Sequence, residues 1–249
     1  MMRRRSRITT HQTGIAHAEA IARAARAAAP PPPDDAAVAA RAANFARGTL
    51  PGGLVPEGVT LALPKGFVVV DCAVSGTDRH GAGKYAALQA LGLIAPDASL
   101  EYEGTRPIVV RGSGHESRGP STHGHESRGP VAISITHSLT RAFAVAARVE
   151  RIGIDIVDDV DDPRFERMAP RYLHREVSFA HTPRDIAKCF AAKEAGLKAL
   201  GLGLLDGGMF DNCAVNVLSL DPPRLASTSH SLRLVFGRTD TSTLAIAFA

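Results

Sequence analysis

Two pairs of short apolar runs constrain the fold of this chain most strongly, because only a few polar residues join the members of each pair. Residues 132–136 and 141–147 form the first pair, and residues 231–237 and 243–248 form the second. Parallel strands need a crossover of a dozen or more residues, whereas antiparallel strands can be joined by a tight turn. The spacing therefore predicts two antiparallel hairpins, the second of which turns at residues 238–241.

Helical patterns accompany these hairpins. Residues 79–93 carry an apolar face at helical spacing, and residues 185–200 form a second helix that ends at the glycines of Gly201-Leu202-Gly203. Further strands are expected at residues 58–63, 66–74, 106–110 and 151–157. Mixed helices and strands with short connections favour an α+β fold class, in which antiparallel sheets pack against helices.

The first 53 residues differ in composition from the rest of the chain. They are rich in Ala, Arg and Pro, and residues 1–50 carry a net charge of +5, whereas the remainder carries −1. Helices are predicted at residues 13–29 and 35–47. We interpret residues 1–53 as an extension with little tertiary anchoring, and an organelle transit peptide is the alternative. Because the positive charge lies in this arm, the folded body is not expected to bind nucleic acid.

A seven-residue segment occurs twice, as residues 114–120 and again as residues 124–130. Gly, Ser, Pro and charged residues cannot build a core, so we expect an exposed loop here. His115, His123 and His125 could in principle bind a metal, but a duplicated flexible loop is the preferred interpretation.

Cysteine content and hydropathy favour a soluble protein of the cytoplasm. Cys72, Cys189 and Cys213 lack the spacing of a zinc site or of a disulfide framework, which fits a reducing compartment. No apolar run reaches the ~20 residues that a membrane span needs.

The helix at residues 185–200 contains the first candidate site. Glu194 and Lys198 are four residues apart and share one face, while Lys193 lies about 100° further round the helix axis. Alanine and glycine surround these charges, so another chain segment or a ligand can come close. A solvated salt bridge and a functional site explain the pattern equally well.

Two upstream segments add polar groups to apolar strands, one inside a strand and one just after a strand. Asp155 lies within an apolar run, where a carboxylate must be paired or bound to a metal. Mg²⁺ typically takes one or two protein carboxylates together with substrate phosphates, and Asp155 with Glu194 would suffice. His137 follows a strand between Thr136 and Ser138, and all three side chains can donate hydrogen bonds to phosphate. The alternatives are a structural aspartate bonded to backbone amides and a structural histidine.

Taken together, these segments resemble the three signatures of the 4′-phosphopantetheinyl transferases in order and spacing. They are Ile133-Ser134-Ile135-Thr136-His137-Ser138, then Gly153-Ile154-Asp155-Ile156, then Phe190-Ala191-Ala192-Lys193-Glu194-Ala195-Gly196-Leu197-Lys198-Ala199. Residues 83–92 are also similar to the family's Gly-Arg-x-Ala-Ala-x-x-Ala-Leu helix, and residues 104–107 to its Gly-Lys-Pro turn. The chain length suits the larger, surfactin-synthetase-activating type, and the resemblance covers roughly residues 55–249.

The resemblance implies two similar α/β halves related by a pseudo-twofold, residues 54–150 and 151–249, with coenzyme A in the cleft between them. It implies that Asp155 and Glu194 bind Mg²⁺. It further implies phosphate or nucleotide contacts for Lys84, Arg106, Thr136, His137, Lys193 and Lys198.

The implied reaction transfers the 4′-phosphopantetheine arm of coenzyme A to a serine of an apo acyl or peptidyl carrier protein and releases 3′,5′-ADP. Such carriers serve fatty acid, polyketide and nonribosomal peptide synthesis. Glu194 would accept the serine proton and Lys198 would assist the leaving group, so these two are the predicted catalytic residues. We expect a monomer whose partners are coenzyme A and a carrier protein. Binding to nucleic acid or to a membrane is not expected.

Three residues depart from the family pattern. Val157 stands where the larger type has a third carboxylate, and a local bend would be needed for Asp158 to replace it. Phe190 replaces a common Trp and Thr136 a common Ser, which preserves an apolar ring and a hydroxyl. Val157 motivates the alternative function, a non-catalytic carrier-protein or coenzyme A-binding relative.

Overall fold

The computed structural model describes residues 52–104, 106–111, 129–158, 163–202 and 214–249. The predicted helices at residues 13–29 and 35–47, nearly all of the duplicated segment, and Cys213 lie outside these ranges. Within them, Cys72 and Cys189 are free thiols, as their spacing predicts.

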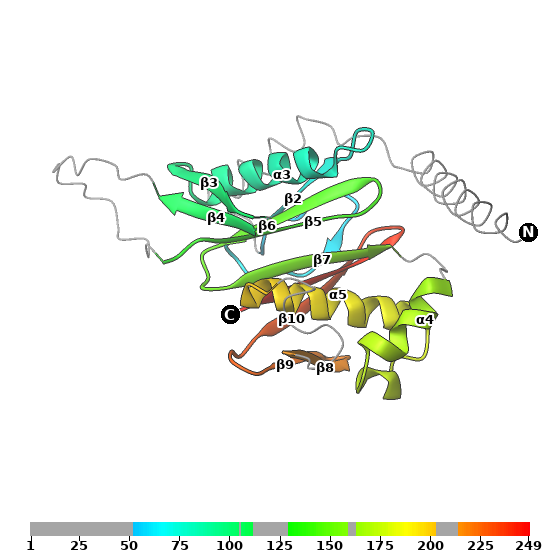
Figure 1. Ribbon diagram of the computed structural model, residues 1–249. Helices are drawn as coiled ribbons and strands as arrows, with labels where there is room; N and C mark the ends of the chain where they lie inside the picture. The colour runs from blue at the N-terminus through cyan, green and yellow to red at the C-terminus, as the bar shows by residue number, and fades with distance from the viewer. Residues whose placement is uncertain (1–51, 105, 112–128, 159–162, 203–213) are drawn as a thin grey trace, which may run out of the picture.

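A three-stranded antiparallel sheet in the order β2-β6-β5 carries helix α3 on one face (Figure 1). Its elements are β2 (Phe67–Ala73), α3 (Arg79–Ile94), β5 (Ala132–His137) and β6 (Arg141–Ala147). Alternate β6 residues on the side of α3 are alanines, and Phe143 and Val145 point the other way. These small side chains let the helix come close, and at Gly83 of α3 an added Cβ would lie only 2.9 Å from Ile135 Cγ2.

A second antiparallel sheet has the order β1-β10-β11-β7, and helix α5 lies against it. Its strands are β1 (Thr60–Leu61), β7 (Ile152–Asp158), β10 (Arg233–Arg238) and β11 (Ser242–Phe248), and the helix is α5 (Pro183–Leu200). The short segments α4 (Pro163–Tyr172), η1 (Glu176–Ser178) and the hairpin β8 (Val215–Leu220) with β9 (Pro223–Ser227) surround α5 on its outer side (Figure 1).

Strand β7 separates two cores because its side chains alternate between them. Ile152, Ile154 and Ile156 pack toward the first sheet, whereas Val157 belongs to the core beneath α5. Strand β7 also lies beside β5, and the Ile154 amide donates a hydrogen bond of 3.2 Å to Ser134 Oγ. The junction of the two sheets therefore brings two of the signature segments together.

Helix α5 begins with a capping box, in which Thr182 and Asp185 satisfy each other's backbone amides, and it ends at Gly201 with φ of 74°. An added Cβ at Gly196 would lie 2.7 Å from Val215 Cγ1, and one at Gly153 would collide with the backbone of α5. The small residues of this segment are thus needed for the close approach of β7 and β8 to the helix.

The predicted helices at residues 79–93 and 185–200 and most predicted strands are confirmed, with ends within a few residues. The two predicted hairpins, β5–β6 and β10–β11, pair antiparallel. The main error in length is at residues 58–63, where only β1 forms. The features that were not predicted are α4, η1, the hairpin β8–β9 and strand β3 (Ala98–Glu103), which pairs with the predicted strand β4 (Arg106–Arg111). Strand β3 alternates exposed with partly buried residues and has no apolar run. Among the described residues, no helix has the length and apolar character to cross a membrane.

Candidate active site

Asp155 is the centre of a polar cluster where β5, β7 and α5 meet. The residue is buried, with only 5% of its surface exposed. Asp155 Oδ1 accepts a hydrogen bond of 2.9 Å from Thr136 Oγ1 and one of 2.6 Å from Lys198 Nζ. The Lys198 ammonium also donates to the carbonyl oxygen of Ile154 at 3.0 Å. The buried carboxylate therefore has both a hydroxyl and a cation as partners, which is what burial of its charge requires.

Glu194 lies one helical turn before Lys198 and takes part in the same electrostatic cluster. Burial raises the pKa of the Glu194 carboxyl to about 7, the negative charge of Asp155 adds to this rise, and Lys198 opposes it. A carboxyl group with a pKa near neutrality can accept a proton efficiently at physiological pH. Glu194 thus has the property that a general base needs.

His137 ends β5 and lies next to further basic side chains. Its ring packs edge to face with His80, with ring centroids 6.0 Å apart. Partial burial lowers the pKa of His137, and the positive charges of Arg79, His80 and Lys198 lower it further. This concentration of positive charge favours an anionic ligand. Arg79 and His80 come from the first turn of α3, and nothing in the sequence pattern singled them out.

A cavity of about 960 Å³ opens beside the charged cluster. Glu194 and Lys198 line it together with apolar residues of β4, β5 and the start of β7. Arg106 also lines the cavity, and its guanidinium group packs against the end of α5: a Cβ at Gly201 would be 2.8 Å from Arg106 Nη1. The cavity therefore combines the charged residues of α5 with apolar residues of β4 and β5, and Glu103, Glu150 and Arg151 add further charges to its lining.

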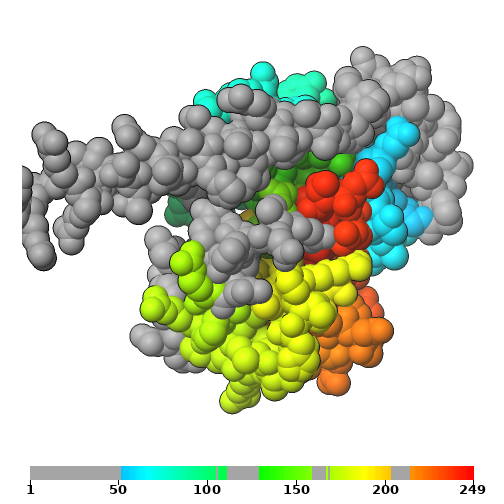
Figure 2. All heavy atoms as spheres, turned by 90° about the vertical axis from the view of Figure 1, so that its right-hand side faces the viewer, coloured from blue at the N-terminus to red at the C-terminus, as the bar shows by residue number. Residues whose placement is uncertain are grey.

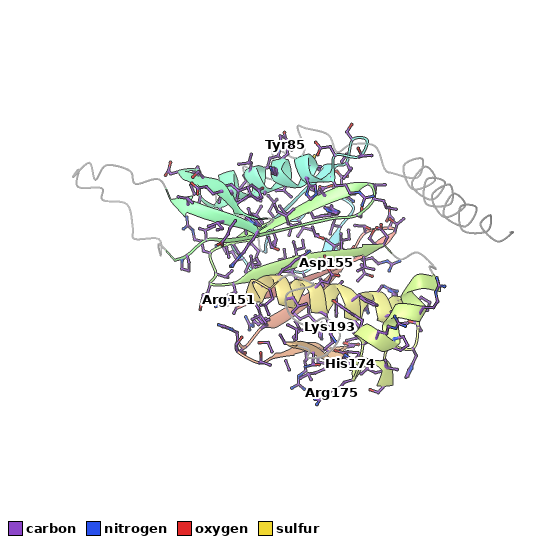
Figure 3. All side chains as sticks on the ribbon, in the orientation of Figure 1. Tyr85, Arg151, Asp155, His174, Arg175 and Lys193 are labelled. Atoms are coloured by element: carbon purple, nitrogen blue, oxygen red, sulfur yellow. The ribbon has the colours of Figure 1, made fainter. Side chains whose placement is uncertain are left out.

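The structure does not bring two of the predicted ligand contacts into this cluster. Lys193 is buried on another side of α5, where its Nζ donates to the carbonyl oxygen of Tyr172 at 2.9 Å and lies 3.2 Å from Glu176 Oε1. Figure 3 shows Lys193 and Asp155 on opposite sides of the helix. Lys84 is exposed on α3, and its Nζ lies 5.0 Å from the centroid of the Tyr102 ring. The expectation that Lys193 contacts phosphate thus meets a physical obstacle, because its charge already compensates that of buried Glu176.

The residues around Asp155 fit a divalent cation with two protein ligands. Val157 is buried on the α5 side of β7 and offers no oxygen. Asp158 is held elsewhere, since its Oδ1 accepts a 2.7 Å hydrogen bond from Ser242 Oγ. Among the described residues, no group of three or more His, Cys, Asp or Glu side chains is placed to hold a metal. Two neighbouring carboxylates that repel each other nevertheless form a donor set that Mg²⁺ accepts when a substrate supplies phosphate oxygens.

The fold and the site together define a mixed α/β protein with an acidic pair and a lysine at the edge of a cavity. Residues 151–249 match the family model of the 4′-phosphopantetheinyl transferase superfamily. This range contains Asp155, Glu194 and Lys198, while Thr136 and His137 lie before it. A search among curated proteins finds none that matches the chain.

Proposed function

We propose that this protein transfers the 4′-phosphopantetheine arm of coenzyme A to a serine of an apo acyl or peptidyl carrier protein. The observation that carries the proposal is the cluster of Glu194, Asp155 and Lys198 at the edge of the cavity, within the range that matches the family model. We also propose that the protein is of the larger, surfactin-synthetase-activating type. In this type, a pseudo-twofold relates two halves, here residues 54–150 and 151–249, and each half has a helix on an antiparallel sheet.

The reaction forms one bond and breaks another at the same phosphorus. The serine Oγ attacks the phosphorus on the pantetheine side, and the bond from this phosphorus to the bridging oxygen of the pyrophosphate breaks. Glu194 accepts the serine proton, and 3′,5′-ADP leaves. Lys198 lies beside both carboxylates and can offset the negative charge that develops on the departing phosphate.

Substrate binding uses the other basic residues. His137, with Arg79 and His80 nearby, provides positive charge for a phosphate of the nucleotide. Thr136 orients Asp155 through its hydroxyl hydrogen bond. Asp155 and Glu194 would hold Mg²⁺, which would neutralise the charge of the pyrophosphate. Arg106 lines the same cavity, where it can approach the nucleotide or the arm.

Mass spectrometry of several apo carrier proteins incubated with coenzyme A and Mg²⁺ tests the reaction. A gain of the phosphopantetheine mass on the carrier, with release of 3′,5′-ADP, is expected. Glu194→Gln should abolish the gain, whereas Glu101→Gln, an exposed carboxylate on β3, should leave it unchanged. No modification of any carrier by the wild-type protein would refute the proposal.

Val157 favours a second candidate function, a relative that binds coenzyme A or a carrier protein without transfer. Its apolar side chain removes one oxygen ligand from the face that carries Asp155. Calorimetry that detects coenzyme A binding, combined with no transfer to any carrier, would support this candidate. If Val157→Glu bound Mn²⁺ more tightly and also gained transfer, the missing carboxylate would explain why the wild-type protein lacks transfer. Asp158→Asn serves as the control for metal binding, because Asp158 is held by Ser242.

A further inference from the structure

The ammonium group of Lys198 binds two oxygens of β7 in the way that a metal cation does. Its Nζ donates to Asp155 Oδ1 at 2.6 Å and to the carbonyl oxygen of Ile154 at 3.0 Å. Carboxylate and carbonyl oxygens are also the ligands that a hard divalent metal takes. Lys198 therefore competes with a metal for the carboxylate on which the candidate metal site depends.

Asp155 has little capacity for a second cation beside this ammonium group. The residue is buried, and its Oδ1 already accepts a 2.9 Å hydrogen bond from Thr136 Oγ1 in addition to the bond from Lys198. Val157, two residues further along β7, offers no oxygen that would extend the site. A metal on Asp155 would thus lie next to Lys198, and because the carboxylate is buried, the two positive groups repel each other more strongly than in solvent.

Lys198 differs from Lys193 in its freedom to leave its partner. The Lys198 side chain is 32% exposed and lines the cavity, whereas the Lys193 side chain is 4% exposed. Lys193 is held by Glu176 and by the carbonyl oxygen of Tyr172, and Figure 2 shows α5 in yellow between α4 in yellow-green and the β8–β9 hairpin in orange. Because a lysine has a flexible four-carbon stem, the Lys198 ammonium group can swing from Asp155 into the cavity while α5 stays in place.

A pyrophosphate group in the cavity would change the balance between lysine and metal. Its oxygens offer the Lys198 ammonium group a new acceptor, so that the lysine no longer needs Asp155. The same pyrophosphate supplies metal ligands of the kind that Mg²⁺ usually takes from a substrate. Pyrophosphate therefore favours metal binding in two ways, and because such coupling is reciprocal, the metal favours pyrophosphate binding by the same factor.

We propose that Lys198 is a built-in cation that keeps a divalent metal off Asp155 and Glu194 until coenzyme A binds, and that it then moves to the pyrophosphate and leaves Asp155 to the metal. This inference rests on the proposed function, which identifies the pyrophosphate as that of coenzyme A. The protein by itself would bind the metal weakly, and together with coenzyme A it would bind the metal tightly. The exchange of partners by Lys198 thus couples assembly of the metal site to the presence of the substrate.

Binding of Mn²⁺, measured from the loss of the EPR signal of free Mn²⁺, tests the exchange without a carrier protein. Lys198→Met should bind Mn²⁺ about tenfold more tightly than wild type when coenzyme A is absent. The enhancement of Mn²⁺ binding by coenzyme A, after subtraction of the Mn²⁺ that coenzyme A binds in solution, should be about tenfold smaller in the variant.

Lys188→Met is the matched control, because it removes the same charge from the same helix. Lys188 lies ten residues before Lys198 on α5, which corresponds to about 15 Å, and it does not line the cavity. Salt screens charges at this separation, so the Mn²⁺ affinities of the control should stay within about twofold of wild type. An Mn²⁺ affinity of Lys198→Met that is equal to or weaker than that of the control would overturn the proposal.

A measurement on the wild-type protein applies even if Lys198→Met does not fold. In NMR spectra of ¹⁵N-labelled protein, the Nζ resonance of Lys198 should stay unchanged when Mg²⁺ is added alone and should shift when Mg²⁺ and coenzyme A are added together. A shift with the same concentration of Mg²⁺ alone, or no shift with both, would refute the exchange. Neither measurement involves transfer, so this inference can fail while a carrier is modified, and it can hold while no carrier is modified.

Discussion

The ammonium group of Lys193 lies 3.2 Å from Glu176 Oε1, and both side chains are almost completely buried. The same carboxylate accepts the Val217 amide, so one ion pair joins η1, α5 and β8. Lys193 precedes Glu194 in the sequence, so this pair anchors α5 beside the residue whose carboxyl interacts electrostatically with Asp155.

The Lys193–Glu176 pair predicts that removal of the lysine alone destabilises the protein strongly, and that removal of both charges destabilises it less. Lys193→Met should lower the free energy of unfolding by about 3–5 kcal/mol, because it leaves the Glu176 carboxylate buried without its cation. Glu176→Gln/Lys193→Met should lose less than the lysine variant alone, since a neutral amide still accepts the Val217 amide. Urea denaturation of the four proteins of this double-mutant cycle measures the effect. Unchanged stability of Lys193→Met with weakened coenzyme A binding would instead support the phosphate contact expected from the sequence.

Glu194 should destabilise the metal-free protein near neutral pH. Its pKa of about 7 in the folded state exceeds the ordinary value, so ionisation costs the folded state more than the unfolded state. The contribution of Glu194 to stability is therefore fully present below pH 4.5 and lost as the pH rises through 7. Glu194→Gln should be more stable than wild type by roughly 3 kcal/mol at pH 7.5 and equally stable at pH 4. Urea denaturation in the presence of a chelator checks this, and equal stabilities at pH 7.5 would contradict it.

His137 should respond to an anionic ligand through its charge. Burial and the nearby cations hold its pKa below 6.5 in the free protein. A bound phosphate should raise this pKa, because it favours the protonated ring. We therefore expect 3′,5′-ADP to bind more tightly as the pH falls from 8 to 6, with an upward shift of the His137 pKa in NMR titrations. His137→Asn should flatten the pH dependence of binding, and a persistent dependence in that variant would assign it to another group.

Gly153 should tolerate no side chain. An added Cβ would collide with the backbone of α5 at Ala195 and lie 2.6 Å from the amide nitrogen of Ala199, and backbone atoms cannot rotate away. We expect Gly153→Ala to lower the free energy of unfolding by about 3 kcal/mol or more and to move α5 relative to β7. Gly92→Ala is the control, because its Cβ meets no atom within 4 Å, and it should raise stability by about 0.5–1 kcal/mol. Thermal denaturation distinguishes the two, and similar effects would contradict the close contact.

Local sequence patterns predicted the elements that carry strong periodicity. The apolar runs at β5, β6, β7, β10 and β11 and the helices α3 and α5 were all recognisable, since each buries a regular face. Strand β3 and helix α4 were not, because the first has no apolar run and the second contains Pro170 within a polar segment. The packing of neighbouring elements stabilises such segments, and a local pattern does not reveal it.

For the site, the sequence by itself determined which residue types were available: Asp155 stands within an apolar strand, His137 at the end of another, and Glu194 and Lys198 on one helical face. The tertiary structure alone decided which of them meet. Thr136 and Lys198 share one oxygen of Asp155 because β5 lies beside β7 and α5 crosses it at Gly153. Lys193, one residue from Glu194, faces a different core because successive helical side chains diverge by about 100°, and only the position of Glu176 showed where its charge is used.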